Sequence, residues 1–261
     1  MAKNKKKQIT LKVAVPTGWG DLTGQQVARV AAEIFKAKNQ DEMLISLAME
    51  FAGLMPRGVS LNQDGDRVYF YYHRDCGNVI LDAEQITAIV DAMRWLSVDN
   101  IAPMAAPELD GYFKPDQKLR SATVEQFVTA DVAFMSFLRN GDQRALRVLA
   151  AIFYAREKYD PDKLQFDAAR MERLDAQLYG VFLWFSGAKI LLAKEFPSVF
   201  DGDDSSDQSS NSPRSGAEYL LEILTSLNGG DVTKNEQIKS LNVYEALHEL
   251  NNKIDKSKNN V

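Results

Sequence analysis

The chain has 261 residues, of which 45% are apolar and 26% are charged. This is the composition of an ordinary globular protein, and a net charge of −5 does not predict a nucleic-acid surface over the whole chain. Cys76 is the single cysteine, so an internal disulfide is excluded and a reducing compartment is expected. No apolar stretch follows the basic start MAKNKKKQ, which argues against a secretory signal.

The first quarter of the chain predicts a tail, a strand and two helices. Residues 1–8, with four lysines, are expected to be a flexible basic tail. Apolar and polar residues alternate over 9–15, the pattern of a strand that ends at Pro16. Residues 23–26 read as a capping box that opens a helix to about Lys38, and a second helix is predicted over 41–54.

A small antiparallel sheet is predicted near the start of the chain, in a fold that is otherwise mainly α. The aromatic stretch 67–73 and the apolar stretch 78–81 predict a hairpin over 67–81, since DCGN between them suits a tight turn. Together with the strand over 9–15 this hairpin would form the sheet. The sequence MPRG at 55–58 is read as a break, and Asp82 as the cap of a helix through Trp95.

The middle of the chain predicts a multi-helix globular core. An extended, proline-containing loop is expected over 101–118, followed by helices over 123–139 and 142–158. Residues 174–196 form the most apolar run and predict one helix buried on nearly every side. A membrane span is the alternative, but only about a dozen residues there lack charge, fewer than the roughly 20 that a bilayer requires. Gly180 and Gly187 would lie on one face, where another backbone could approach.

The domain organisation predicted from these patterns has one helical core domain over 9–200. Residues 201–215, DGDDSSDQSSNSPRS, are acidic and serine-rich and predict a linker, because they offer too little apolar area to offset the entropy of ordering. Residues 216–261 would form a C-terminal helical segment, whose last helix carries an apolar stripe that begins at Val243.

Several stretches resemble chemical motifs but lack essential members. The tripeptide His73-Arg-Asp matches a kinase catalytic loop, yet Ile80 stands where that loop needs asparagine. His73 and Cys76 have the spacing of two zinc ligands, but no further cysteine is present to complete a site. The aspartates of 201–207 resemble the start of a calcium loop, but the glycine and glutamate that such a loop needs are missing. The aromatic residues 69–72 suit a buried hairpin better than a nucleic-acid platform. We therefore expect no catalytic, metal or cofactor-binding residues and no enzymatic activity.

Two short motifs carry a family resemblance. Residues 15–23, VPTGWGDLT, resemble the opening of a group of Bacteroidetes phage and prophage proteins. Residues 231–236, DVTKNE, followed by 241–247, LNVYEAL, are similar to the closing segment of tail-region proteins from such phages. That resemblance implies a tail assembly chaperone or a tail-proximal protein, and neither motif is catalytic.

The expected function is therefore protein–protein binding during phage tail assembly, plausibly as a chaperone for the tape measure protein. The alternative is a structural virion component, a neck or tail adaptor. Binding of a helix in a groove is the expected mode, with a partner-binding face formed by Val243, Tyr244, Leu247 and Leu250 unless that helix simply packs on the core. The expected location is the cytoplasm of the bacterial host, or the virion under the alternative, with no membrane or nucleic-acid partner. Oligomeric state is left open.

Overall fold

The computed structural model describes residues 13–97, 100–154, 159–200 and 225–259. The chain divides into two compact units, the first made of residues 1–21 and 36–100 and the second of residues 22–35 and 101–261. This division differs from the single domain predicted over 9–200, because residues 36–100 are inserted into the sequence of the second unit. The predicted tail over 1–8 and linker over 201–215 lie outside the described residues.

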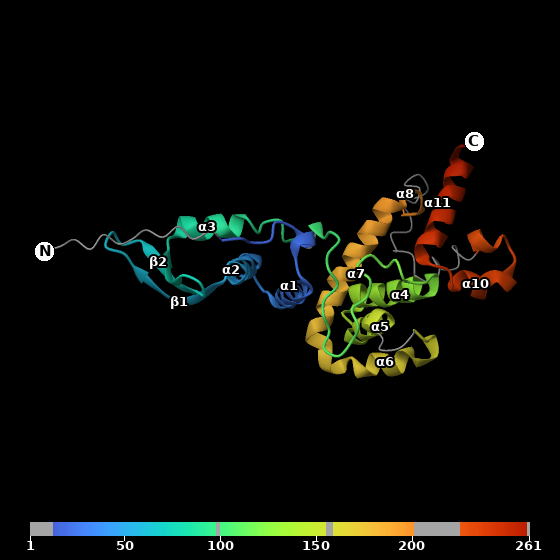
Figure 1. Ribbon diagram of the computed structural model, residues 1–261, viewed down its shortest axis with the longest axis horizontal. Coiled ribbons are helices and arrows are strands. Elements are labelled where there is room, and N and C mark those ends of the chain that lie inside the picture. Colours follow the sequence, from blue (N-terminus) through green and yellow to red (C-terminus); the bar gives the residue numbers. More distant parts are fainter. Residues whose placement is uncertain (1–12, 98–99, 155–158, 201–224, 260–261) are drawn as a thin grey trace. The chain divides into compact units, whose positions relative to one another are not determined.

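The first unit combines a three-stranded antiparallel sheet with two helices (Figure 1). The sheet has the order β1-β2-β3, and the helices precede and follow it in the sequence. The elements are the 3-10 turn η1 (Trp19–Asp21), helix α2 (Gln40–Phe51), strands β1 (Leu54–Leu61), β2 (Arg67–His73) and β3 (Gly77–Leu81), and helix α3 (Ala83–Asp91). The mainly α fold with a small sheet is thus confirmed.

The identity of the third strand differs from the prediction. The hairpin over 67–81 is present, and in it Tyr71 of β2 lies opposite Val79 of β3. The third strand is β1, which pairs with the other edge of β2 and places Pro56 opposite Tyr71. Residues 13–15 of the strand predicted over 9–15 are not in a strand, and residues 9–12 lie outside the described part. Pro56 and Gly58 look like helix breakers in sequence. In the structure they lie in an edge strand, where proline is tolerated, on either side of an irregularity in the register.

The second unit is helical in all its described elements. It begins with α1 (Gly24–Lys36), resumes with α4 (Val124–Asn140) and α5 (Gln143–Tyr154), and continues through η3 (Pro161–Lys163), α6 (Leu164–Arg170) and η4 (Glu172–Leu174). The later elements are α7 (Asp175–Glu195), α8 (Pro197–Phe200), η5 (Val232–Lys234), α10 (Asn235–Lys239) and α11 (Val243–Asn259). Helix α6 was not predicted.

Local signals explain where these helices begin and end. Thr123 caps α4 in a complete capping box with Gln126, and Gly141 ends the helix in the left-handed conformation at φ 63°. Thr23 and Gln26 make the reciprocal bonds of the predicted box before α1. Asp82 caps α3 in the same way, although that helix ends at Asp91 rather than Trp95.

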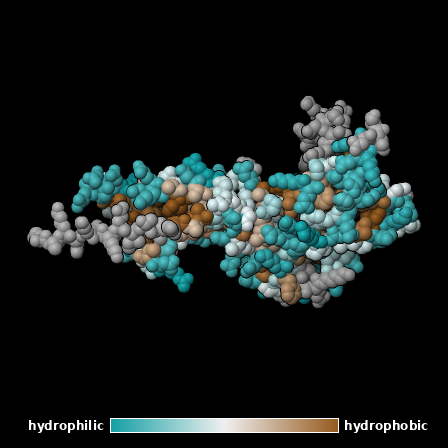
Figure 2. All heavy atoms as spheres, turned by 45° about the horizontal axis from the view of Figure 1, so that its top comes forward, coloured by the Kyte–Doolittle hydropathy of each residue, from teal (hydrophilic) through white to brown (hydrophobic). Residues whose placement is uncertain are grey.

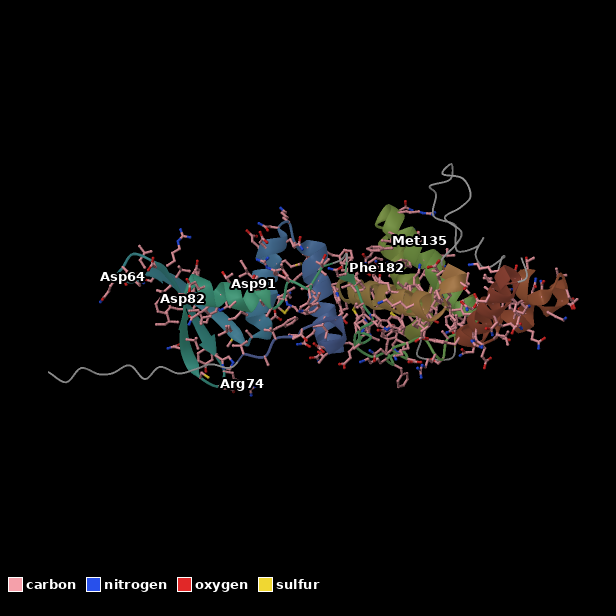
Figure 3. The ribbon with its side chains drawn as sticks, turned by 90° about the horizontal axis from the view of Figure 1, so that it is seen from above. Asp64, Arg74, Asp82, Asp91, Met135 and Phe182 are labelled. Atoms are coloured by element: carbon pink, nitrogen blue, oxygen red, sulfur yellow. The ribbon has the colours of Figure 1, made fainter. Side chains whose placement is uncertain are left out.

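Helix α7 forms the centre of the second unit. Phe134 of α4 stacks on Phe182 with ring centroids 4.7 Å apart, and Phe185 has no exposed surface. In Figure 3 the label of Phe182 marks α7, and Met135 marks α4. The buried side of α7 extends almost all the way round the helix: Leu178, Gly180, Val181, Phe182, Leu183, Trp184, Phe185, Gly187, Ala188 and Leu192. The prediction of a buried helix over 174–196 is confirmed within the described part of the chain.

Residues 101–109, which we call the strap, run across the glycine face of α7. A Cβ atom added to Gly187 would lie 2.6 Å from the carbonyl oxygen of Ala102, and one added to Gly180 would lie 3.2 Å from Pro107 Cβ. The buried hydroxyl of Tyr154 donates a hydrogen bond of 2.8 Å to the Pro107 carbonyl. The predicted close approach of another backbone to this face is therefore confirmed.

Two ion pairs secure the ends of the helical core. Arg147 of α5 donates to both carboxylate oxygens of Asp175, at 2.9 and 2.7 Å, where α7 begins. Lys189 pairs with Asp131 of α4 and lies 4.8 Å from the centroid of the Phe134 ring. Because both basic groups are largely covered, these pairs fix the register of α7 against α4 and α5.

Candidate functional site

The first unit contains an open groove whose lining residues are all described. It forms where α2 ends and the chain reverses into β1. Ala52 ends the helix, and Gly53 turns the chain at φ 69°. A Cβ atom at Gly53 would also meet the His73 ring at 3.2 Å, so glycine permits both the turn and the close contact.

The groove has an apolar lining contributed by one face of α2 and the start of β1. Its volume is about 600 Å³, within the range of ligand-binding pockets. Ile45 and Met55 are 41% and 50% exposed, so the cavity opens to solvent. The lining consists of Glu42, Ile45, Ser46, Met49 and Glu50 from α2, then Gly53, Leu54, Met55 and Pro56, with Tyr71 from β2. The spacing of the α2 residues is that of one helix face.

Acidic groups border this apolar surface. Helix α2 carries Asp41, Glu42 and Glu50 and has no basic residue. Two of these carboxylates, those of Glu42 and Glu50, line the groove. Burial raises the pKa of Tyr71, and the nearby Tyr69 raises it further, so the phenol stays neutral near pH 7. The arrangement offers apolar contact together with negative charge, which suits an apolar ligand that carries basic groups.

The same unit exposes further large apolar side chains. Seven of the eight residues of β1 are exposed. The exposed apolar side chains include Met55, Val59 and Leu61 of β1 and Ile80 of β3. Figure 2 shows hydrophobic residues, in brown, grouped on the surface of this unit among hydrophilic ones. The strand register places Met55 and Ile80 on the face of Tyr72 and Phe70, and Val59 on the opposite face beside Tyr69, so these side chains do not form one continuous patch.

The predicted partner-binding residues lie elsewhere, in the second unit, and are largely covered. Val243 and Leu247 are each 1% exposed and Leu250 is 7% exposed. The Val243 amide donates to the Ala122 carbonyl at 2.9 Å, and the Tyr244 hydroxyl donates to the Lys118 carbonyl at 2.7 Å. Their side chains therefore pack within the unit, and a partner could reach them only if α11 detached.

The residues of the two resemblance motifs have structural roles. Trp19 is buried and contacts Trp95 edge to face, with ring centroids 5.6 Å apart. The Thr17 hydroxyl donates to Asp21 at 2.6 Å, and this bond lowers the pKa of Asp21. In the second motif Asp231 accepts from the Thr233 amide and hydroxyl and opens η5. Neither motif lines the groove.

The zinc-like and aromatic patterns do not belong to a cluster of metal-ligating groups in the described part of the chain. His73 Nδ1 accepts from the Asp75 amide, and the nearby Cys76 is exposed. No group of metal-ligating side chains occurs among the residues that the structure describes. Of the aromatic strand, Tyr71 is buried, while Phe70 and Tyr72 are half-buried on the opposite face. The calcium-like stretch near residue 201 lies outside the described part.

The apolar stretch around α7 also meets the criteria for a membrane span. Glu172–Glu195 is long and apolar enough to cross a membrane by length and composition alone. In this structure the same stretch is packed among α4, α5 and the strap, which is the environment of a core helix.

The groove was not predicted, although α2 carried a partial signal. Met43, Leu44 and Leu47 are buried on one side of α2, and Ile45 and Met49 add apolar character beyond it. These additional apolar residues indicate a second apolar face on α2. The strand that lies against this face, β1, was interpreted from the sequence as a break. Comparison of the chain with protein-family models, with curated proteins and with solved structures finds no match.

Proposed function

We propose that this protein is a non-enzymatic binding protein that takes up an apolar segment of a partner in the groove between α2 and β1. The single observation that carries the proposal is this open apolar cavity of about 600 Å³, bordered by Glu42 and Glu50. Its size and lining suit several apolar side chains of one polypeptide segment. The first unit can supply this surface without exposing the core of the second unit.

The biological setting of the proposal comes from the sequence resemblance at residues 15–23 and 231–247. Under that resemblance the protein acts in tail assembly of a bacteriophage or prophage, in the host cytoplasm. Its partner is another tail protein, the tape measure protein, whose apolar segments need shielding before the tail tube forms. The groove replaces the α11 face as the proposed contact surface, because Val243, Leu247 and Leu250 are buried.

A matched pair of substitutions tests the groove. Ile45→Asp places a charge in the lining, and Val132→Asp places one at a site of similar exposure, 45%, on α4. Each variant is co-expressed with a phage tape measure protein, and the soluble, co-purified fraction of that protein is measured. We expect Ile45→Asp to abolish co-purification and Val132→Asp to retain it. Equal behaviour of the two variants would remove the groove from the proposal.

The alternative role, a neck or tail adaptor, is separated by mass spectrometry of purified virions. A chaperone is expected to be absent or present only in traces, because it leaves when the tail tube forms. Stoichiometric copies in the particle would instead favour the structural component.

A further inference from the structure

Strand β1 has an outer edge along which no other strand pairs in the described part of the chain. The sheet has the order β1-β2-β3, so β1 is bonded to a strand on one side only. The side chains of Val59 and Leu61 are 60% and 65% exposed. Pro56, which has no amide, lies before the irregularity in the register and leaves residues 58–61 free of proline. An exposed edge of this kind can bind a further strand through its backbone.

The register identifies the backbone groups of β1 that point outward. Just beyond the strand, the Asn62 amide donates a hydrogen bond of 2.8 Å to the Asp66 carbonyl in the turn to β2. Inward and outward backbone groups alternate along an antiparallel strand. Ser60, two residues earlier, therefore also bonds towards β2, while the amides of Val59 and Leu61 point away from it.

The groove extends onto this outer edge. Leu54 and Pro56 lie on the face of Tyr71, whereas Met55 lies on the opposite face with Tyr72. All three of these β1 residues line the groove. Because successive residues of a strand point to opposite faces, a cavity lined by all three runs along the edge of β1 rather than over one face. A strand added at this edge would therefore also enter the groove.

Charge near this edge favours a basic occupant over a second copy of the chain. Helix α2 carries Asp41 and Glu42 in its first turn and has no basic residue. Arg57 is the single basic residue of β1, and its guanidinium lies 5.3 Å from the centroid of the Tyr72 ring, on the face away from Tyr71. Because α2 packs against β1, two copies paired through β1 would bring two acidic helices together. A segment with lysine or arginine has the complementary charge.

We infer that the partner segment binds as a fourth strand along the outer edge of β1. The inference rests on the proposed function and specifies how the groove holds its ligand. The backbone of the segment bonds to Val59 and Leu61, and every second side chain enters the apolar groove beside Ile45. A basic side chain of the segment lies near Glu42. The ligand is therefore an extended basic segment with alternating apolar residues, in place of the helix expected from the sequence.

Proline substitutions at the edge test this mode of binding. Val59→Pro removes one outward amide, whereas Val59→Ala keeps the amide and shortens the side chain. Leu61→Pro and Leu61→Ala form a second matched pair. Each variant of the full chain is co-expressed with a phage tape measure protein, and the co-purified fraction of that protein is measured. We expect each proline variant to capture about fivefold less than its alanine counterpart, because a backbone hydrogen bond to the segment is lost.

Hydrogen–deuterium exchange resolved to single residues tests the same bonds without any substitution, and so covers a proline variant that fails to fold. In the free protein, the amides of Val59 and Leu61 should exchange fast and that of Ser60 slowly. In the complex with the tape measure protein, exchange of the two outward amides should slow at least about tenfold. The Ser60 amide is the internal control.

A pair of charge substitutions tests the basic character of the segment. Glu42→Gln should lower capture about threefold, as expected for the loss of one exposed ion pair. Glu84→Gln removes the same charge from the same unit outside the groove lining and should leave capture unchanged.

Three outcomes overturn the inference. Equal capture by folded proline and alanine variants, or unchanged exchange of Val59 and Leu61 in the complex, would exclude pairing with β1. Equal effects of Glu42→Gln and Glu84→Gln would remove the basic ligand. Protection of the outward amides in the chain alone, rising with its concentration, would make a second copy the occupant. The proposed function survives such a failure if Ile45→Asp still abolishes capture. Absence of capture by the unmodified chain would instead remove the proposed function itself.

Discussion

Helix α7 and the α2–β1 region are both rich in apolar residues, but their surroundings differ completely. Ten residues of α7 are buried, and helices or the strap cover it on nearly every side. Strand β1 is the edge of a three-stranded sheet, and seven of its eight residues are exposed. The comparison shows that apolar content alone does not distinguish a core from a binding surface. The number of elements that pack around a segment decides which it becomes.

The largest expected effect is a difference in the free energy of unfolding between a substitution in α7 and one in the groove. Phe185→Ala should lower the free energy of unfolding by about 3–5 kcal/mol, because the fully buried ring leaves a cavity among Phe127, Phe134 and Phe153. Ile45→Ala, from the groove, should cost less than about 1 kcal/mol, since that side chain is already 41% exposed. Urea unfolding followed by circular dichroism measures both. Similar losses for the two variants would contradict the comparison.

The next effect concerns the helix that was predicted to bind a partner. Leu247→Ala should destabilise the second unit by about 2–5 kcal/mol, because the side chain is 1% exposed. His248→Ala, on the exposed side of α11, serves as the control and should stay within about 0.5 kcal/mol. The same unfolding measurement applies. A negligible loss of unfolding free energy for Leu247→Ala would mean that α11 does not pack tightly, and α11 would again be a candidate binding surface.

A smaller effect tests the close approach of the strap to α7. Gly187→Ala should destabilise by about 1–3 kcal/mol, because the new methyl group would lie 2.6 Å from the Ala102 carbonyl oxygen. That cost outweighs the gain in helix propensity, at most about 1 kcal/mol. Gly18→Ala meets no atom within 4 Å and is the matched control. Thermal unfolding of the two variants should therefore differ, with Gly187→Ala melting lower.

The smallest effect is a change in the pKa of Asp21, near the start of the first unit. Hydrogen bonds from the Thr17 side chain and amide lower the pKa of Asp21 below its ordinary value of 3.8. A carboxylate with a lowered pKa stabilises the fold above the unfolded pKa, and this contribution is lost as the pH falls through the folded pKa. Thr17→Val should raise the pKa of Asp21 towards 3.8, which an NMR titration of the side chain would measure. An unchanged midpoint would remove the side-chain bond as the cause.

Much of the helical architecture could be predicted because its signals are local. The capping box at Thr123 and the stop at Gly141 lie within a few residues of the helix ends that they set. Apolar residues on nearly every side of α7 predicted that neighbours would surround it, and Gly180 and Gly187 indicated the face on which the strap runs. The path of the strap itself was not predictable, since an extended chain without periodicity carries no signal of what it packs against.

The sheet and the groove depend on pairings that are not local. Strand β1 contains Pro56 and Gly58, which locally resemble a break, and only pairing with β2 makes the segment a strand. The groove then arises from the approach of β1 to α2 around Gly53. The mistake at β1 therefore propagated to the site, because a groove between two elements cannot be predicted when one of them is missing.

The most direct test of the binding account is hydrogen–deuterium exchange of the full chain with and without a tape measure segment. The account predicts new protection in peptides from Gln40–Leu61, where α2 and β1 line the groove, with α7 and α11 unchanged. Protection that appears instead over Val243–Asn259, with none at the groove, would contradict it.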